Sequence, residues 1–156
     1  MSAVTQPGLE STDRRIVELL AADGRMSFTD LGKATGLSTS AVHQRVKRLE
    51  QRGLITGYGA AVDHEAIGLP LTAFISITPI DPAAPDDYPD RLRGIAHIES
   101  CWSVAGEESY ILKVRVGTPA DLEDLLARIR ASAGVTTRTT VVLSTPFENR
   151  AVTDGA

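Results

Sequence analysis

The stretch between positions 38 and 51 is rich in small polar and cationic side chains, the types that can hydrogen-bond to base edges and phosphates of a DNA duplex. Gln44 can pair with adenine through two hydrogen bonds, and Lys47 or Arg48 can reach guanine or a phosphate. Serine and threonine hydroxyls suit phosphate contacts at a helix N-terminus. The candidate DNA-contacting residues are Ser38, Thr39, Ser40, His43, Gln44, Arg45, Lys47 and Arg48.

Helical periodicity explains how these side chains could be displayed together. On a helical wheel, Val42, Val46 and Leu49 form a narrow apolar stripe, and Gln51 joins the polar residues that point away from it. The stripe is suited to packing, which would leave the polar face free to enter a groove. A solvated face on an ordinary helical bundle is the alternative.

Two of the candidates have competing roles. His43 is interpreted as a groove or phosphate contact rather than a metal ligand, because no second His, Cys or carboxylate follows it at i+4. Arg45 lies nearer the apolar stripe, so a structural ion pair and a phosphate contact are equally consistent with its position.

Residue types that carry catalysis or bind metals are sparse. Glu107 and Glu108 are adjacent and would face opposite ways on a strand, and no Ser/His/Asp set, phosphate-binding loop or metal-ligand spacing accompanies them. The single cysteine, Cys101, excludes an intrachain disulfide, and its apolar flanks favour a packed strand position over a functional thiol. An enzyme is therefore the weakest hypothesis, and we expect no cofactor and no metal.

Apolar periodicity predicts three helices in the first half of the chain, over residues 12–22, 27–35 and 38–52. Ser27 and Ser38 are typical helix caps, and Gly53 suits the turn after a helix. Only residues 35–37 separate the second and third helices, which is the turn length of a helix-turn-helix. Residues 54–62 form a glycine-punctuated stretch that predicts a short ribbon, where a wing would lie.

The second half of the sequence has a different hydrophobic periodicity. Alternating and β-rich runs predict strands at residues 71–78, 98–105, 110–116 and 138–145. A weak helix is predicted over 86–95, and a strong one between Thr118 and Gly134. The order β-α-β-β-α-β is typical of the ferredoxin-like arrangement.

The net charge of -4 is distributed unevenly over the 156 residues. Residues 1–60 carry eight Lys and Arg against six Asp and Glu, giving +2, whereas residues 61–156 carry eight against fourteen, giving -6. This asymmetry indicates two modules with different partners. No apolar run approaches the ~20 residues of a membrane span, and residues 1–8 lack a signal-peptide pattern, so we expect a cytoplasmic protein without a membrane partner.

The order and spacing of several short motifs resemble the Lrp/AsnC, or feast/famine, regulators over nearly the whole chain. The motifs lie at residues 13–16 (DRRI), 23–25 (DGR), 36–38 (GLS), 45–50 (RVKRLE), 57–58 (GY), 106–110 (GEESY) and 134–135 (GV), before a threonine-rich final strand.

The resemblance implies an α+β protein in which an N-terminal winged helix-turn-helix is joined to a C-terminal ferredoxin-like βαββαβ domain of the RAM/ACT type. The expected parts are a DNA-binding domain (1–60), a linker (61–70), an effector-binding and oligomerisation domain (71–147) and a tail (148–156). It also implies a regulator of double-stranded DNA controlled by a small effector, expected to be an amino acid. Sheets pair into dimers in this family, so homodimers that assemble into a higher oligomer such as an octamer are expected.

The resemblance places the effector between subunits. Carried over by position, the pocket residues are Ser103, Val104, Ala105, Gly106, Glu107, Ser109, Tyr110, Gly134, Val135 and Thr136. Glycines let backbone N–H groups approach the carboxylate of a zwitterion, and Glu107 or Glu108 could accept its ammonium. The same residues also fit a plain polar hairpin turn between two apolar strands.

Two residues near this turn leave alternatives open. Many family members have an acid where this chain has Ser109, so the ammonium contact could move to a neighbour or the effector preference could differ. Trp102 fits a subunit contact, a core position or an aromatic edge of the pocket.

A rival hypothesis treats residues 71–147 as a metabolite sensor that acts on protein partners, with the helical half as an adaptor. Effector binding that leaves DNA affinity unchanged would favour this hypothesis.

Overall fold

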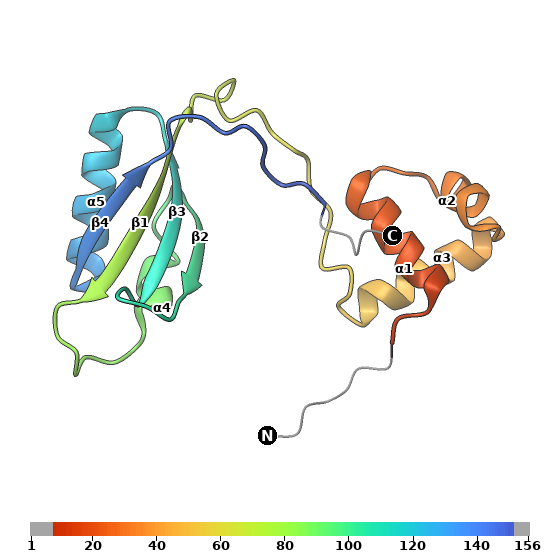
Figure 1. The fold of residues 1–156 in the computed structure, drawn as a ribbon, viewed down its shortest axis with the longest axis horizontal. Helices are drawn as coiled ribbons and strands as arrows, with labels where there is room; N and C mark the ends of the chain where they lie inside the picture. The colour runs from red at the N-terminus through yellow and green to blue at the C-terminus, as the bar shows by residue number, and fades with distance from the viewer. Residues whose placement is uncertain (1–7, 152–156) are drawn as a thin grey trace. The chain divides into compact units, whose positions relative to one another are not determined.

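The computed structural model describes residues 8–151. These residues divide into two compact units, one of residues 8–61 with 147–151 and one of residues 62–146. The first unit is helical, and the second is an antiparallel sheet with two helices (Figure 1). A helical unit joined to an antiparallel sheet with helices on one face confirms the expected α+β fold class.

The helical unit contains three helices, α1 (Ser11–Ala22), α2 (Phe28–Thr35) and α3 (Thr39–Gln51). The predicted caps are confirmed. The Ser27 hydroxyl accepts a hydrogen bond from the Asp30 N–H at 3.0 Å, and the Ser38 hydroxyl accepts one from the Ala41 N–H at 3.2 Å. Gly36, with φ of 73°, ends α2 in the left-handed conformation that glycine adopts readily.

One apolar cluster holds the three helices together, and the predicted stripe on α3 belongs to it. The buried members are Ile16, Leu20, Leu31, Val42, Val46 and Leu49. Because α3 contributes three of these residues, its rotation about its own axis is set by burial. The opposite face of α3 is therefore turned to solvent.

The turn between α2 and α3 brings two stretches of backbone unusually close. The Leu37 N–H donates to the Gly32 carbonyl at 3.0 Å. A Cβ built on Gly32 would lie 2.6 Å from the Leu37 carbonyl oxygen, closer than real Cβ atoms approach other atoms. Position 32 thus requires glycine because of this close approach.

Residues 54–62 contain no strand, so the predicted ribbon is not present in this structure. The Leu54 N–H donates to the Leu49 carbonyl at 2.9 Å, which closes the end of α3. The Tyr58 hydroxyl then donates to Glu50 Oε1 at 2.8 Å. A strand needs a neighbouring strand to satisfy its backbone hydrogen bonds, and the described residues of the helical unit include no other strand.

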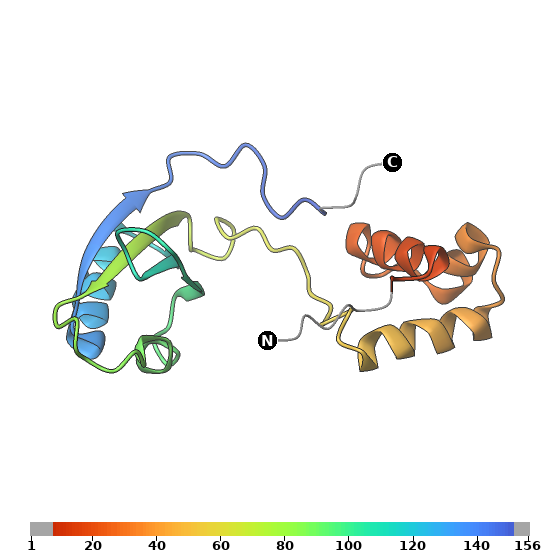
Figure 2. The same cartoon turned by 60° about the horizontal axis from the view of Figure 1, so that its bottom comes forward.

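The second unit has a four-stranded antiparallel sheet in the order β2-β3-β1-β4. Its elements are β1 (Leu71–Pro79), α4 (Tyr88–Leu92), β2 (Ile98–Ser103), β3 (Tyr110–Val116), α5 (Pro119–Ala133) and β4 (Val135–Val141). Both helices lie on the same side of the sheet (Figure 2). This is the ferredoxin-like topology.

Alternation along the strands separates the two faces of this sheet. On β1 and β3, Ile75, Ile77 and Leu112 are fully buried and pack with Leu125 and Ile129 of α5. The side chains between them point to the other face, which no helix of this unit covers (Figure 2). The core is therefore a single layer between sheet and helices, and the opposite sheet face is open.

Several element boundaries differ from those predicted, most clearly for the last strand. Gly134, with φ of 64°, turns the chain from α5 straight into β4, so this strand begins at Val135 rather than at residue 138. It ends at Val141, opposite Ala73, rather than at residue 145. The end of the ladder with β1 therefore decides where β4 stops. The shorter α4 and β2 likewise replace the predicted 86–95 and 98–105.

Residues 142–151 contain no helix or strand. The predicted tail, 148–156, lies partly outside the described residues, as do residues 1–7 of the N-terminus. Within residues 8–151, no helix combines the length and the hydropathy needed to cross a bilayer.

Candidate functional site

The outward face of α3 brings together three of the eight predicted DNA-contacting residues and Gln51. Gln44, Lys47, Arg48 and Gln51 are exposed and line one shallow hollow of about 340 Å³. Amides and cations are thereby displayed in adjacent turns of one rigid helix. This is the combination that major-groove recognition and phosphate contact require.

The start of α3 supplies a different chemistry. Ser38, Thr39 and Ser40 are exposed, and the hydroxyls of Ser38 and Ser40 lie 3.2 Å apart. The backbone N–H groups of a helix's first turn are directed towards solvent, which favours an anion such as a phosphate. His43 is exposed as well, and its ring meets the edge of Phe28 at a centroid distance of 5.4 Å.

Arg45 differs from the other predicted contacts because it faces α1. Its guanidinium Nη1 donates to Glu10 Oε2 at 2.9 Å and to Asp13 Oδ1 at 2.8 Å. These hydrogen bonds, to Glu10 and then to Asp13, raise the pKa of Arg45. Of the two roles that the sequence left open, the structural ion pair is the one formed here, and it fastens α3 to α1.

The loop between β2 and β3 brings most of the predicted effector residues together. Ser103, Val104, Ala105, Gly106, Ser109 and Tyr110 line one hollow of about 430 Å³. The Val104 N–H donates to the Ser109 carbonyl at 3.1 Å, and the Ser109 N–H donates to the Ile77 carbonyl at 3.0 Å. These bonds hold the loop against the end of β1. The opposite wall runs from the end of β1 to the start of α4 and includes Pro79, Asp86 and Tyr88.

The remaining predicted residues lie elsewhere. Thr136 and Glu107 line a second, smaller hollow of about 150 Å³ with Ser76 and Arg138. Gly134 and Val135 line neither hollow, and the Val135 side chain is buried in the core at 1% exposure. The predicted site therefore divides into two neighbouring hollows, which share Glu108 as a lining residue.

The two adjacent carboxylates have distinct surroundings. Glu108 Oε1 accepts hydrogen bonds from Ser76 Oγ at 2.9 Å and from Arg138 Nη2 at 3.0 Å. A hydrogen bond from its own backbone N–H, followed by those from Ser76 and Arg138, lowers the pKa of Glu108. The Glu107 side chain is 90% exposed and lies 3.8 Å from Arg138 Nη1. Glu107 is therefore the carboxylate with more room for an incoming cation.

Tyr110 sits at the junction between core and hollow. Its ring is buried at 7% exposure, and its hydroxyl donates to Asp86 Oδ1 at 2.7 Å. The hydrogen bond to Asp86, with burial as the second cause, raises the pKa of Tyr110. This bond ties β3 to the segment before α4 and so holds the two walls of the larger hollow together.

The open face of the sheet carries an ion network beside exposed aromatic rings. Glu99 contacts Lys113 Nζ at 3.2 Å and Arg115 Nε at 2.6 Å. Burial alone would raise the pKa of Glu99, but the hydrogen bonds from Arg115 and Lys113 outweigh it and lower the pKa. Trp102 and Phe74 are 46% and 36% exposed. This exposure of Trp102 excludes a core position and leaves the subunit contact and the pocket edge.

Cys101 was expected to be a packed strand residue, and the structure corrects this. Its side chain is exposed because β2 is an edge strand of the sheet. Desolvation beside the strand nevertheless raises the pKa of its thiol.

Sequence reasoning missed Ser76, Asp86 and Arg138, all of which contact predicted site residues. Strand alternation alone could have placed Ser76 and Arg138 on one face of the sheet. Their meeting with Glu108 depends on the pairing of β4 with β1, which aligns Ser76 opposite Arg138. The register of two distant strands was not available from local patterns.

Comparison with protein families matches both units. The AsnC-type helix-turn-helix domain matches residues 9–50, and the Lrp/AsnC ligand binding domain matches residues 72–152. The chain belongs to the Lrp/AsnC family. The helix-turn-helix match covers the three helices except the last residue of α3, and the second match covers both hollows and the sheet except the first residue of β1.

Individual relatives of this Lrp/AsnC protein agree with the assignment. It is 54% identical to the HTH-type transcriptional regulator LrpA of Mycobacterium tuberculosis, over 91% of this chain and 95% of the relative. It is 34% identical to the leucine-responsive regulatory protein of Escherichia coli, over 88% of each chain. The solved structure of a feast or famine regulatory protein from M. tuberculosis, complexed with L-methionine, superposes with a TM-score of 0.91 at 52% identity, covering 93% of this chain and 99% of that one.

Membership in the Lrp/AsnC family identifies the chain as a DNA-binding transcriptional regulator. This family consists of regulators rather than enzymes, so the adjacent glutamates of the β2–β3 loop need no catalytic explanation.

Proposed function

We propose that this regulator binds a specific DNA duplex through α3 and that an amino acid bound beside the β2–β3 loop changes its affinity for DNA. The observation that carries the proposal is the exposed row of Gln44, Lys47 and Arg48 on a helix whose other face is anchored in the core. Residues 1–60 would bind DNA, residues 61–70 would act as a linker, and residues 71–147 would bind the effector. Such a protein works beside the chromosome, which in prokaryotic relatives is in the cytoplasm.

Each candidate on α3 is given one role in DNA recognition. Gln44 reads a base edge, while Lys47 and Arg48 contact guanine or phosphates. Ser38, Thr39 and Ser40 bind a phosphate at the helix N-terminus, with His43 at the flank. Arg45 acts indirectly, because its bonds to Glu10 and Asp13 hold α3 at a fixed angle on α1.

The effector site is proposed to be the hollow of about 430 Å³ at the β2–β3 loop. Its volume lies in the range of about 300–1,000 Å³ typical of small-molecule sites. Gly106 allows the loop backbone to approach a carboxylate, and the exposed Glu107 accepts the ammonium. Glu108 is assigned to positioning, since Ser76 and Arg138 already occupy its Oε1 atom. The L-methionine complex of the M. tuberculosis relative supports an amino acid as the ligand class.

We propose that the effector site lies at an interface between subunits. The open sheet face carries Phe74, Ile111 and Trp102, which are apolar residues that water would otherwise contact. We propose that two copies pair through this face and that dimers assemble further, up to an octamer. The ion network of Glu99 would then lie at the margin of that contact.

Titration with L-methionine is expected to change the affinity for an operator duplex by about 5–150-fold, the usual range of allosteric coupling. Fluorescence anisotropy of a labelled duplex from the chain's own upstream region measures this change.

Glu107→Gln is expected to weaken methionine binding about tenfold in calorimetry, because a charge-assisted hydrogen bond is lost. Glu123→Gln, an exposed acid on α5, is the control and should bind methionine normally.

Two results would contradict this assignment. Normal methionine binding by Glu107→Gln would remove Glu107 from the site. Methionine binding that leaves DNA affinity unchanged would favour the adaptor hypothesis over an effector-controlled regulator.

Charge placed on the open sheet face is expected to separate the subunits. Phe74→Glu puts a carboxylate where we expect partner side chains, so sedimentation velocity should show a shift towards monomer at micromolar concentration. Ala131→Glu, on the exposed surface of α5, is the control and should keep the wild-type assembly. An unchanged sedimentation coefficient for Phe74→Glu would exclude this face as the dimer contact.

A further inference from the structure

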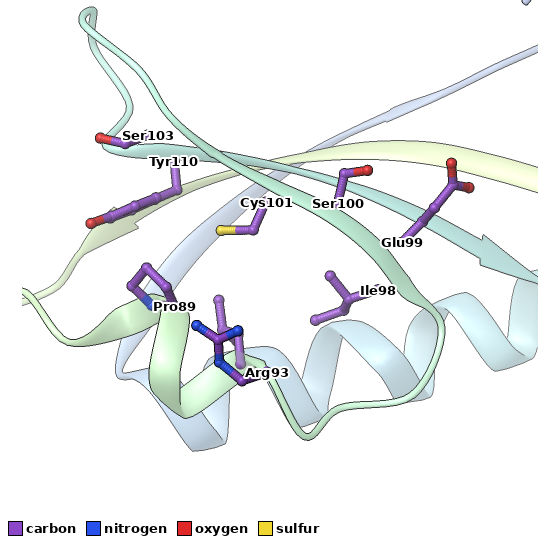
Figure 3. A pocket seen from close by; sticks show the side chains of 9 residues that line it. Pro89, Arg93, Ile98, Glu99, Ser100, Cys101, Ser103 and Tyr110 are labelled. Atoms are coloured by element: carbon purple, nitrogen blue, oxygen red, sulfur yellow. The ribbon is translucent and has the colours of Figure 1, made fainter. Parts of the chain in front are cut away.

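A cavity of about 560 Å³ lies between α4 and β2, next to the effector loop. Ser103 and Tyr110 line both spaces, and the remaining lining residues of this cavity differ from those of the effector hollow. Most of its wall is apolar and comes from Pro89, Leu92, Ile98, Cys101 and Tyr110. Figure 3 shows the Cys101 thiol and the Ile98 side chain directed from β2 into this space.

Arg93 provides the one cationic side chain among the residues that line the cavity. It follows directly after α4, and its guanidinium extends over the cavity towards β2 (Figure 3). Its ion pair with Asp90 is 3.5 Å long, and both side chains are about four-fifths exposed, at 79% and 81%. Because an exposed pair of this kind is weak, Arg93 can exchange Asp90 for a ligand carboxylate at little cost.

The lining contains no carboxylate directed at a bound ammonium. Glu99 is the only acid among the lining residues, and Figure 3 shows its side chain pointing away from the cavity. It is bound instead to Lys113 and Arg115 on the other face of the sheet. The charge pattern is therefore one cation above an apolar floor.

We propose that this cavity is a second ligand site and that it binds a small apolar monocarboxylate. The carboxylate pairs with Arg93, and the hydrocarbon part lies against Ile98, Leu92 and Cys101. A zwitterionic amino acid of the same shape binds less well, because its ammonium would lie beside the Arg93 cation with no carboxylate directed at it. This site is separate from the effector site proposed above, although Ser103 and Tyr110 line both.

Leucine and 4-methylpentanoate differ only in the ammonium group, which is the group that the proposed site should reject. Leucine has the carbon skeleton and carboxylate of 4-methylpentanoate and carries an ammonium in addition. Cys101 reports occupancy, because it lines the cavity and is the only cysteine in the 156 residues. Reaction of the full-length protein with a disulfide reagent such as DTNB therefore measures a single site.

At about ten times its Kd, 4-methylpentanoate should leave roughly one cavity in ten open and slow the reaction of Cys101 about tenfold. Leucine at the same concentration should give much less protection. Arg93→Gln should raise the concentration of 4-methylpentanoate needed for half-protection by about tenfold or more. Arg128→Gln, an exposed arginine of α5 that does not line the cavity, is the matched control and should behave as the wild type.

Calorimetric titration with 4-methylpentanoate provides a second measurement that does not depend on the thiol. Heat of binding that disappears in Arg93→Gln and persists in Arg128→Gln would support the site. Equal protection by leucine and 4-methylpentanoate, no protection by 4-methylpentanoate, or undiminished protection in Arg93→Gln would each overturn the proposal.

Discussion

Replacing Gln44 and Lys47 together by alanine is expected to weaken binding to the specific duplex by about 100-fold without unfolding the protein. A side chain that pairs with a base through two hydrogen bonds contributes about 1–3 kcal/mol of discrimination, and each lost phosphate contact adds to this. Both side chains are exposed and lie outside the apolar cluster of the helical unit. Their loss should therefore change the free energy of unfolding by no more than about 0.5 kcal/mol.

The salt dependence of DNA affinity should also distinguish the two substitutions. If Lys47 contacts a phosphate, Lys47→Ala lowers the slope of log K against log salt by about one unit and weakens binding to all sequences alike. Gln44→Ala should leave that slope unchanged and reduce only the preference for the specific site.

Arg128→Ala, which removes an exposed charge from α5, is the control for the change in net charge. Anisotropy titrations of specific and random duplexes at several salt concentrations measure both effects. If the double variant kept its preference for the specific duplex, α3 could not be the recognition helix in the register that we propose.

Gly32→Ala is expected to destabilise the helical unit by about 1–3 kcal/mol, the usual cost of overpacking, and to weaken DNA binding with it. This change in stability is opposite in sign to the usual effect, because replacing glycine by alanine within a helix normally stabilises the helix by about 1 kcal/mol. Here the new methyl group would lie 2.6 Å from the Leu37 carbonyl oxygen. That oxygen belongs to backbone, so relief requires the turn to move and α3 to tilt.

Urea unfolding followed by circular dichroism at 222 nm measures the loss of stability, and anisotropy measures the loss of DNA affinity. Gly57→Ala is the matched control, because a Cβ at Gly57 meets no atom within 4 Å and its φ is not positive. A Gly32→Ala protein that was more stable than the wild type and bound DNA normally would show that the turn is not constrained in this way.

These two predictions concern different requirements of one recognition surface. The side chains of Gln44 and Lys47 supply the chemistry of contact, whereas Gly32 and Arg45 supply the angle at which the helix is presented. Arg45 shows how the second requirement is met, since its two hydrogen bonds to α1 use a cation that would otherwise favour DNA. A residue of a recognition helix can thus contribute to DNA recognition only by fixing the position of the helix, without contacting DNA itself.

Local patterns were sufficient for the parts of the fold that depend on neighbours in sequence. The hydroxyl caps at Ser27, Ser38 and Thr118 were readable because each accepts a bond from an N–H three residues later. The valine-leucine stripe of α3 was readable because burial follows the helical period. The strand order followed from the succession of elements, for which the ferredoxin-like topology is the common solution.

Contacts between distant segments were decided by the tertiary structure alone. Whether Arg45 met a phosphate or a carboxylate depended on where α1 placed Glu10 and Asp13, more than thirty residues away. The exposure of Cys101 followed from the position of β2 at the sheet edge, and the division of the effector residues followed from the pairing of β4 with β1. Periodicity determines which face of an element is buried, but the packing of elements against one another decides which side chains meet across space.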